Sequence, residues 1–281
     1  MSAPVEKVSV AAISEADQAA LAVDAARRSR LKWRKRLLPV LAVLCIGILW
    51  WQAVTQLGVK PFIAPSPLAV AQVFVTRFHM MLVNLAPTAL EAVVGFVLGN
   101  TIAVLIATAF VQRKVVEEAF YPVALMVNTI PIVASAPILV LLLGNGIAPK
   151  VAISAIICFF PTLVNMTRGF RDVNPQALEL MRVLSASDWE VFFKVRVKNA
   201  LPFLFSALRI TASTSVIGAI VGEWIGTNVG IGALIIQATY SFDSALLYAS
   251  VVMGSALALL FFGIISVAET RIIKWNVAQA R

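Results

Sequence analysis

Six long apolar runs restrict this chain to a small set of folds. Each run is close to the roughly 20 residues that a helix needs to cross about 30 Å of hydrocarbon. Open strands leave backbone groups unsatisfied in lipid, and the runs lack the alternating pattern of strands, so we predict helices. The runs cover about 37–57, 87–111, 120–143, 150–168, 202–222 and 245–268.

The composition excludes a water-soluble globule. Hydrophobic residues make up 60% of the 281 residues and charged residues only 13%, whereas soluble domains contain about 25% charged residues. Both cysteines, Cys45 and Cys158, lie in apolar runs, which disfavours a disulfide framework or a thiolate metal centre. We therefore expect an all-α, polytopic membrane protein with about six transmembrane helices.

The distribution of basic residues predicts the topology. They are dense before the first run and around the connection between the fourth and fifth runs, whereas the opposite connections contain only Lys60, Arg77 and Lys150. The positive-inside rule then places both termini in the cytoplasm. The basic cluster at 27–36 adjoins an apolar run, so we interpret it as an orientation signal that contacts lipid, not as a nucleic-acid site.

Three regions follow from this topology. Residues 1–36 form a cytoplasmic N-terminal segment with a basic helix, and residues 37–275 form the transmembrane domain. Within that domain, residues 169–202 form a cytoplasmic loop that is too regularly patterned to be a linker.

The loop pattern predicts two short helices. Asn174-Pro175 is typical of a helix start, and the stretch 185–188, SASD, provides caps for a second helix over 189–198. Two amphipathic helices joined by a turn of small residues form either a surface for docking a partner or a helix pair that rests on lipid headgroups.

The stretch 179–202, ELMRVLSASDWEVFFKVRVKNALP, resembles the EAA loop of the permease subunits of binding-protein-dependent ABC importers. Glu179 stands at the position of the motif's Glu and Ser185 at that of its Gly, while Leu180-Met181 replaces its two alanines. A serine still permits a tight turn between two helices.

Further segments resemble the nitrate/sulfonate/taurine branch of these permeases, in the same order, over about 37–275. They are FIAPSP at 62–67, TALEAVVGFVLG at 88–99, the stretch from Ile130-Pro131 through Gly146, and GEWIG at 222–226 followed by GIG at 230–232.

The resemblance implies a permease subunit in the bacterial inner membrane that moves a small solute by alternating access. It implies a homodimer that works with two copies of an ABC ATPase and with a periplasmic or lipid-anchored solute-binding protein. The helix at about 174–187 would couple to the ATPase, through Glu179, Arg182, Ser185, Ala186 and Trp189. The chain has no G-x-x-x-x-G-K-[ST] phosphate loop, so we expect no catalytic residue and no cofactor in this subunit.

A second group of residues is expected at a substrate pathway or gate: Glu91, Pro131, Gly222 and Glu223. A lone carboxylate at mid-membrane costs at least about 2.5–3.5 kcal/mol, so it faces a cavity or a partner. Glu91 therefore either lines the pathway or makes a structural hydrogen bond. The spacing of Gly218 and Gly222 allows close helix contact, within one subunit or across a dimer.

No metal-ligand spacing occurs, and we expect the lone His79 on the surface. The alternatives to an importer permease are a secondary carrier and a membrane scaffold with a docking loop, although the paired halves of many carriers are not apparent. For the substrate, the resemblance allows sulfonate-, taurine- or nitrate-like anions and small organic compounds such as pyrimidines or aromatics. Apart from Arg209, just inside the fifth run, the interiors of the apolar runs contain no Lys or Arg, which favours a neutral or cationic organic solute.

Overall fold

The computed structural model describes residues 37–273, which are helical and without strands in that range. The chain divides after Val59 into two units. In the first unit, the described part contains one helix, Leu37–Gln56, which is long and apolar enough to cross a membrane. The expected basic helix within residues 1–36 lies outside the described residues.

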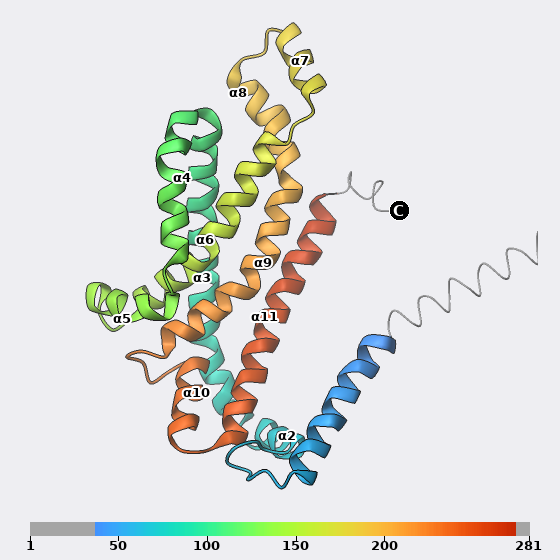
Figure 1. Ribbon diagram of the computed structural model, residues 1–281, viewed down its shortest axis with the longest axis vertical. Helices are drawn as coiled ribbons and strands as arrows, with labels where there is room; N and C mark the ends of the chain where they lie inside the picture. Colours follow the sequence, from blue (N-terminus) through green and yellow to red (C-terminus); the bar gives the residue numbers. More distant parts are fainter. Residues whose placement is uncertain (1–36, 274–281) are drawn as a thin grey trace, which may run out of the picture. The chain divides into compact units, whose positions relative to one another are not determined.

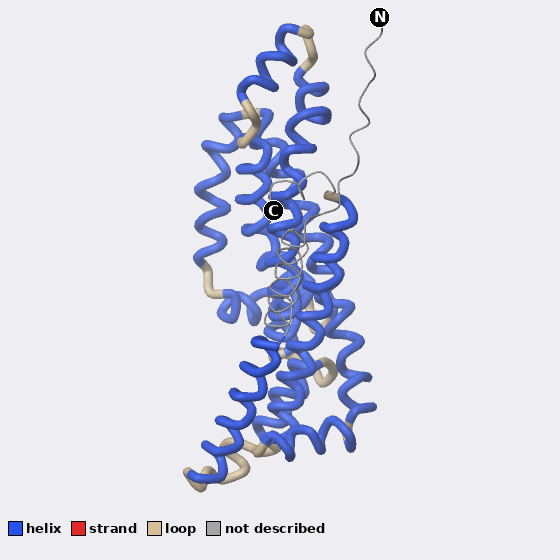
Figure 2. Tube along the Cα trace, turned by 90° about the vertical axis from the view of Figure 1, so that its right-hand side faces the viewer, coloured by secondary structure: helices blue, strands red, loops and turns tan. Residues whose placement is uncertain are grey.

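The second unit is built around three helices in close contact, α3 (Phe78–Gln112), α6 (Ile147–Arg171) and α9 (Val197–Glu223). Helix α6 packs along both α3 and α9, and α11 (Ser244–Ile272) packs mainly on α9 and on the short helix α10 (Ile231–Tyr240). The loop helices lie at one end of this unit, and α10 and α2 (Pro67–Thr76) lie at the other (Figure 1). Figure 2 shows that helices make up most of the described chain.

Glycines allow these helices to touch along their backbones. A Cβ atom on Gly218 would lie 2.8 Å from the Cα of Ser154, and one on Gly222 would lie 2.9 Å from the Cα of Lys150. Both contacts join α9 to α6 within one subunit. Small residues at a spacing of four therefore bring the two helices together, as in other membrane bundles.

The third apolar run, expected over 120–143, is broken in the structure. Helix α4 (Lys114–Thr129) ends and α5 (Ile132–Leu143) turns away from it by 100°. Pro131 has no N–H and forces the preceding Ile130 into an extended conformation, with ψ at 124°. The described residues therefore contain five helices that are long and apolar enough to cross a membrane, or six spans if α4 and α5 count as one.

The loop between α6 and α9 differs from expectation in its second half. Helix α7 (Pro175–Val183) begins at the expected cap, where the side chain of Asn174 accepts a hydrogen bond from the Gln176 N–H. The second loop helix was expected to end at residue 198, but the helix that begins with α8 (Asp188–Val191) continues past it. A π-helical turn, Phe192–Arg196, joins it directly to α9, because no helix breaker intervenes and Pro202 is accommodated inside α9.

Candidate functional site: a docking loop and a buried charge network

The loop carries an exposed apolar surface beside exposed charges. Its apolar members, with Glu179 and Arg182 beside them, are Leu180, Val183, Leu184, Trp189 and Phe193, all of them exposed. The rings of Trp189 and Phe193 stack at a centroid distance of 5.7 Å. An exposed apolar surface of this kind is typical of a site that binds another protein.

The turn between α7 and α8 places Ser185 in the left-handed region, with φ at 51°. This conformation suits glycine, which is the residue of the motif that Ser185 replaces. Ser187 then caps α8: its hydroxyl accepts from the Glu190 N–H, and the Glu190 carboxylate accepts from the Ser187 N–H. Ala186 is partly buried in this turn.

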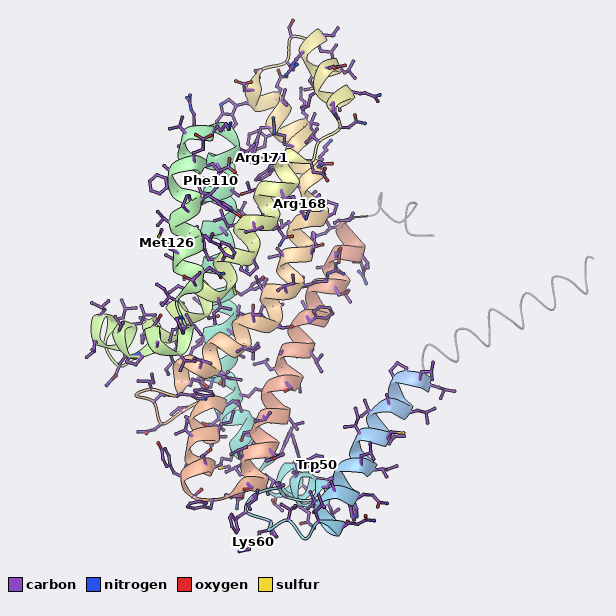
Figure 3. The ribbon with its side chains drawn as sticks, in the orientation of Figure 1. Trp50, Lys60, Phe110, Met126, Arg168 and Arg171 are labelled. Atoms are coloured by element: carbon purple, nitrogen blue, oxygen red, sulfur yellow. The ribbon has the colours of Figure 1, made fainter. Side chains whose placement is uncertain are left out.

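The base of the loop is fixed to the helices on both sides of it. Arg196 donates a hydrogen bond to the carbonyl oxygen of Phe170 at 2.9 Å, and Asn199 donates to the carbonyl oxygens of Gly169 and Asp172 at 3.0 and 2.6 Å. At the same end of α6, where Figure 3 labels Arg168 and Arg171, Arg171 pairs with Glu117 of α4. These bonds tie the loop to both α6 and α9.

A buried ion pair lies at the opposite end of α6. Lys150 Nζ is 3.0 Å from Glu91 Oε1, and the Glu91 residue is only 2% exposed. The same Nζ donates to the hydroxyl of Thr227 at 3.2 Å. Lys150 was expected in a connection between spans. That expectation is wrong, because α6 begins at Ile147 and carries Lys150 in its first turn, packed against α3 and α9.

Glu223, at the end of α9, belongs to the same network. It is 1% exposed, and its two carboxylate oxygens accept hydrogen bonds from the Thr88 hydroxyl and the Gly232 N–H, both at 2.6 Å. Thr88 precedes Glu91 by three residues on α3, so its bond to Glu223 brings the two carboxyl groups to the same part of the bundle. We call Glu91, Lys150, Glu223 and Thr88 the charge network.

The charge network also satisfies the start of α10. The first N–H groups of a helix have no partner inside that helix. Here the Ile231 N–H donates to the Thr88 hydroxyl at 2.9 Å and the Gly232 N–H donates to Glu223, while the Gly230 N–H donates to Asn84 at 2.9 Å. Side chains of α3 and α9 thus hold the entry to α10.

Gly230 is required by this arrangement. Its φ of +122° is a conformation that other residues rarely adopt, and a Cβ atom there would overlap the Glu223 carboxylate. The turn 224–230 can therefore pack closely on the charge network only with glycine at this position.

Three of the four residues expected at a pathway or gate are close together. Glu91, Glu223 and Gly222 all contact the charge network or belong to it, whereas Pro131 is exposed at the bend between α4 and α5. The surroundings of Glu91 favour the structural contact over an open pathway surface. His79 is exposed, and residues 37–273 contain no group of three His, Cys, Asp or Glu side chains that could hold a metal ion.

Two further polar contacts between helices were not predicted from the sequence. Arg209 of α9 pairs with Glu269 of α11 at 3.0 Å. Asn100 of α3 accepts hydrogen bonds from the hydroxyls of Thr162 of α6 and Thr211 of α9, at 2.5 and 3.2 Å. No local spacing signals either contact, since the partners come from helices far apart in the sequence.

The helices and the loop define a multi-pass membrane protein. Residues 99–274 match the family described as the inner membrane component of binding-protein-dependent transport systems. The chain belongs to this family and is an ABC importer permease of the inner membrane.

Individual relatives cover most of this chain. It is 31% identical to a formylaminopyrimidine transport permease, ThiX, of Halalkalibacterium halodurans, over 86% of this chain and 96% of the relative. It is 30% identical to a riboflavin transport system permease, RibX, of Chloroflexus aurantiacus, over 88% and 92%. It is 26% identical to a putative aliphatic sulfonates permease, SsuC, of Bacillus subtilis, over 89% and 90%.

A solved structure has the same fold. A chain of the inward-facing MetNI methionine ABC transporter matches 67% of this chain and 90% of its own length, with a TM-score of 0.52 and 21% identity. At this identity the likeness concerns the fold alone.

Proposed function

We propose that this permease carries a small, ring-containing organic solute that is not an anion, such as a pyrimidine or another aromatic compound. The observation that carries the proposal is that Lys150 and Arg209, the basic side chains of α6 and α9 beyond the turns at the loop end, are each paired with a carboxylate. A permeating sulfonate or nitrate would have to compete with Glu91 and Glu269 for these cations. Relatives named for a formylaminopyrimidine and for riboflavin support the same class.

The cognate solute-binding protein provides the test. We expect thermal-shift screening to select a pyrimidine or an aromatic compound over taurine, alkyl sulfonates and nitrate. Uptake of the selected compound into proteoliposomes that contain the permease and its ATPase should then require ATP. Selection of an anion, followed by its ATP-driven uptake, would contradict the substrate class but not the importer function.

The proposed assembly is a homodimer of this chain with two ATPase subunits and a periplasmic or lipid-anchored binding protein, and with both termini in the cytoplasm. Helix α7 and the residues after it, within about 174–187, would sit in a groove of the ATPase. The exposed apolar residues of the loop and its fixed base support this role, because such a surface can bind a partner and pass its movement to α6 and α9.

Co-purification tests this assembly. A tagged permease should retain its ATPase in a ratio of two to two. Uptake driven by an ion gradient without any ATPase would instead indicate a secondary carrier, and an ATPase that stays bound after deletion of 175–187 would exclude the loop as the docking site.

A further inference from the structure

The charge network contains more acid than base. Glu91 and Glu223 provide two carboxyl groups, and Lys150 provides one ammonium group. The elements packed around them add no further charge: α10 and its preceding turn contribute backbone N–H groups and the Thr227 hydroxyl. Helix α5 has no ionisable residue. The ionisable residues of α11 are Tyr248, Glu269 and Arg271. Fully ionised, this buried network would carry one uncompensated negative charge, which is costly in a membrane protein interior.

The hydrogen bonds indicate which carboxyl groups carry the proton that neutralises this charge. Glu91 Oε1 accepts from Lys150, but Oε2 is buried and accepts no N–H or O–H bond from the described residues. The neighbouring buried carboxyl group is that of Glu223, which accepts a hydrogen bond from Thr88, three residues before Glu91 on α3. Two ionised carboxylates are both acceptors, so a hydrogen bond between them requires a proton on one of them.

We infer that Glu91 and Glu223 hold one proton between them, with Glu223 as the protonated partner, so that the buried network is a neutral proton-binding site. Glu91 is ionised because Lys150 lies directly against it at 3.0 Å. Glu223 has a hydroxyl and a backbone N–H as its other partners and no cation in direct contact. The proton on Glu223 is donated to Glu91, and the second charge is removed.

The site gives the protein a defined response to pH. When the pH rises far enough to remove this proton, two carboxylates face one ammonium in a buried space. The folded state loses stability on the way to that pH, because the unfolded chain, whose carboxyl groups are solvated, releases the proton at a lower pH than the folded chain does. The loss therefore occurs as the pH rises, and a variant that has no such proton should not show it.

Infrared difference spectroscopy of the purified full-length chain in lipid nanodiscs tests for the proton. A protonated carboxyl group and a carboxylate absorb at distinct frequencies. Wild type minus Glu223→Gln at neutral pH should show the loss of one protonated carboxyl band and no carboxylate. Glu118→Gln, which removes an exposed acid of α4, is the matched control and should show the loss of a carboxylate alone. Loss of a carboxylate alone in Glu223→Gln would overturn the inference.

Thermal unfolding tests which carboxyl group carries the proton. Glu223→Gln keeps a donor toward Glu91, so its midpoint should stay near that of wild type and should not fall at alkaline pH. Glu91→Gln removes the partner of Lys150 and should lower the midpoint by more than about 2 °C, the scale of a single destabilising substitution in a protein of this size. The reverse order would place the proton on Glu91 and contradict the assignment.

If neither variant can be purified, titration of the wild-type chain decides. The thermal midpoint should fall as the pH rises toward the interval in which the protonated carboxyl band disappears, and it should level off above that interval. A wild-type spectrum at neutral pH without a protonated carboxyl band would overturn the proposal.

Discussion

At the scale of single residues, the contact between α6 and α9 depends on the absence of a side chain at Gly222. A Cβ atom on Gly222 would lie 2.9 Å from the Cα of Lys150, and the same lysine forms the ion pair with Glu91. A change at Gly222 therefore displaces a charged partner as well as a helix.

We expect Gly222→Leu to lower transport while the subunit still inserts and recruits its ATPase. Overpacking of this kind costs about 1–3 kcal/mol, and a comparable shift between two conformations changes their ratio by about tenfold. Uptake in proteoliposomes measures the effect. The control is Gly263→Leu on α11, where a Cβ atom would meet nothing within 4 Å. Equal uptake by the two variants would mean that the close approach at Gly222 is dispensable.

Single residues also show what the sequence could and could not reveal. Asn174 was predicted as a helix cap because its local context is sufficient, and the structure confirms it. The pairing of Glu91 with Lys150 was not predicted, since the two are on different helices and no spacing rule connects them. Lys150 was misplaced because the polar and turn-forming residues before it, 144–149, disguise the start of α6.

At the scale of elements, the turn between α7 and α8 sets the direction of the docking loop. Ser185 holds a conformation that costs a residue with a side chain about 1–2 kcal/mol, and glycine pays little of this cost.

Ser185→Gly should therefore be tolerated or slightly stabilising, and Ser185→Val should reduce ATPase binding because a β-branched residue strains the same turn. ATPase co-purification and uptake measure both variants. Severe loss in the glycine variant, with a normal valine variant, would show that the turn conformation is not what the loop requires.

Helix α7 gives a second prediction at this scale. Glu179→Lys should leave membrane insertion intact but uncouple ATP hydrolysis from uptake, because it reverses a charge on the exposed face of the proposed docking helix. ATPase stimulation by the loaded binding protein is measured beside uptake. Glu118→Lys, an equal reversal on the exposed part of α4, is the control. Normal uptake by Glu179→Lys, with wild-type ATPase binding, would remove the coupling role.

The broken helix at Pro131 marks a limit of element prediction. The run contains Pro122, Pro131 and Pro137, and only the middle one ends a helix. Proline inside a membrane helix is tolerated where neighbours satisfy the carbonyl group that it frees. Which proline breaks the helix therefore depends on packing that a sequence does not display.

At the scale of the whole molecule, few polar contacts fasten the outer helix to the core. The pair Arg209–Glu269 joins α9 to α11, and α11 is otherwise largely apolar and little buried within one subunit. This pair is therefore a charged contact between α11 and α9.

We expect Arg209→Met to lower the thermal midpoint and the uptake rate, because it leaves Glu269 without its cation. The double variant Arg209→Met with Glu269→Met should recover most of the loss, since it leaves no unpaired charge in lipid. Thermal unfolding in nanodiscs measures both. A double variant that is as impaired as the single one would assign Arg209 a role beyond this pair.

The fold class and the cap that starts α7 could be predicted because hydropathy and helix caps act locally. The charge network could not, since it is assembled from α3, α6, α9 and the entry to α10. Its members appeared separately in the sequence as a carboxylate in a span, a loop lysine and a glycine-rich turn.

One consequence follows from the uninterrupted path of α8, the π turn and α9. Helix α9 alone spans 27 residues, so its length is about 40 Å at 1.5 Å per residue. The loop lies at one end of this continuous helix and Glu223 lies at the other. A tilt of roughly 5° about the loop end would carry Glu223 by about 3.5 Å over that length, further than any of its hydrogen bonds is long. A small displacement of the loop would thus break or re-form the hydrogen bonds at the start of α10.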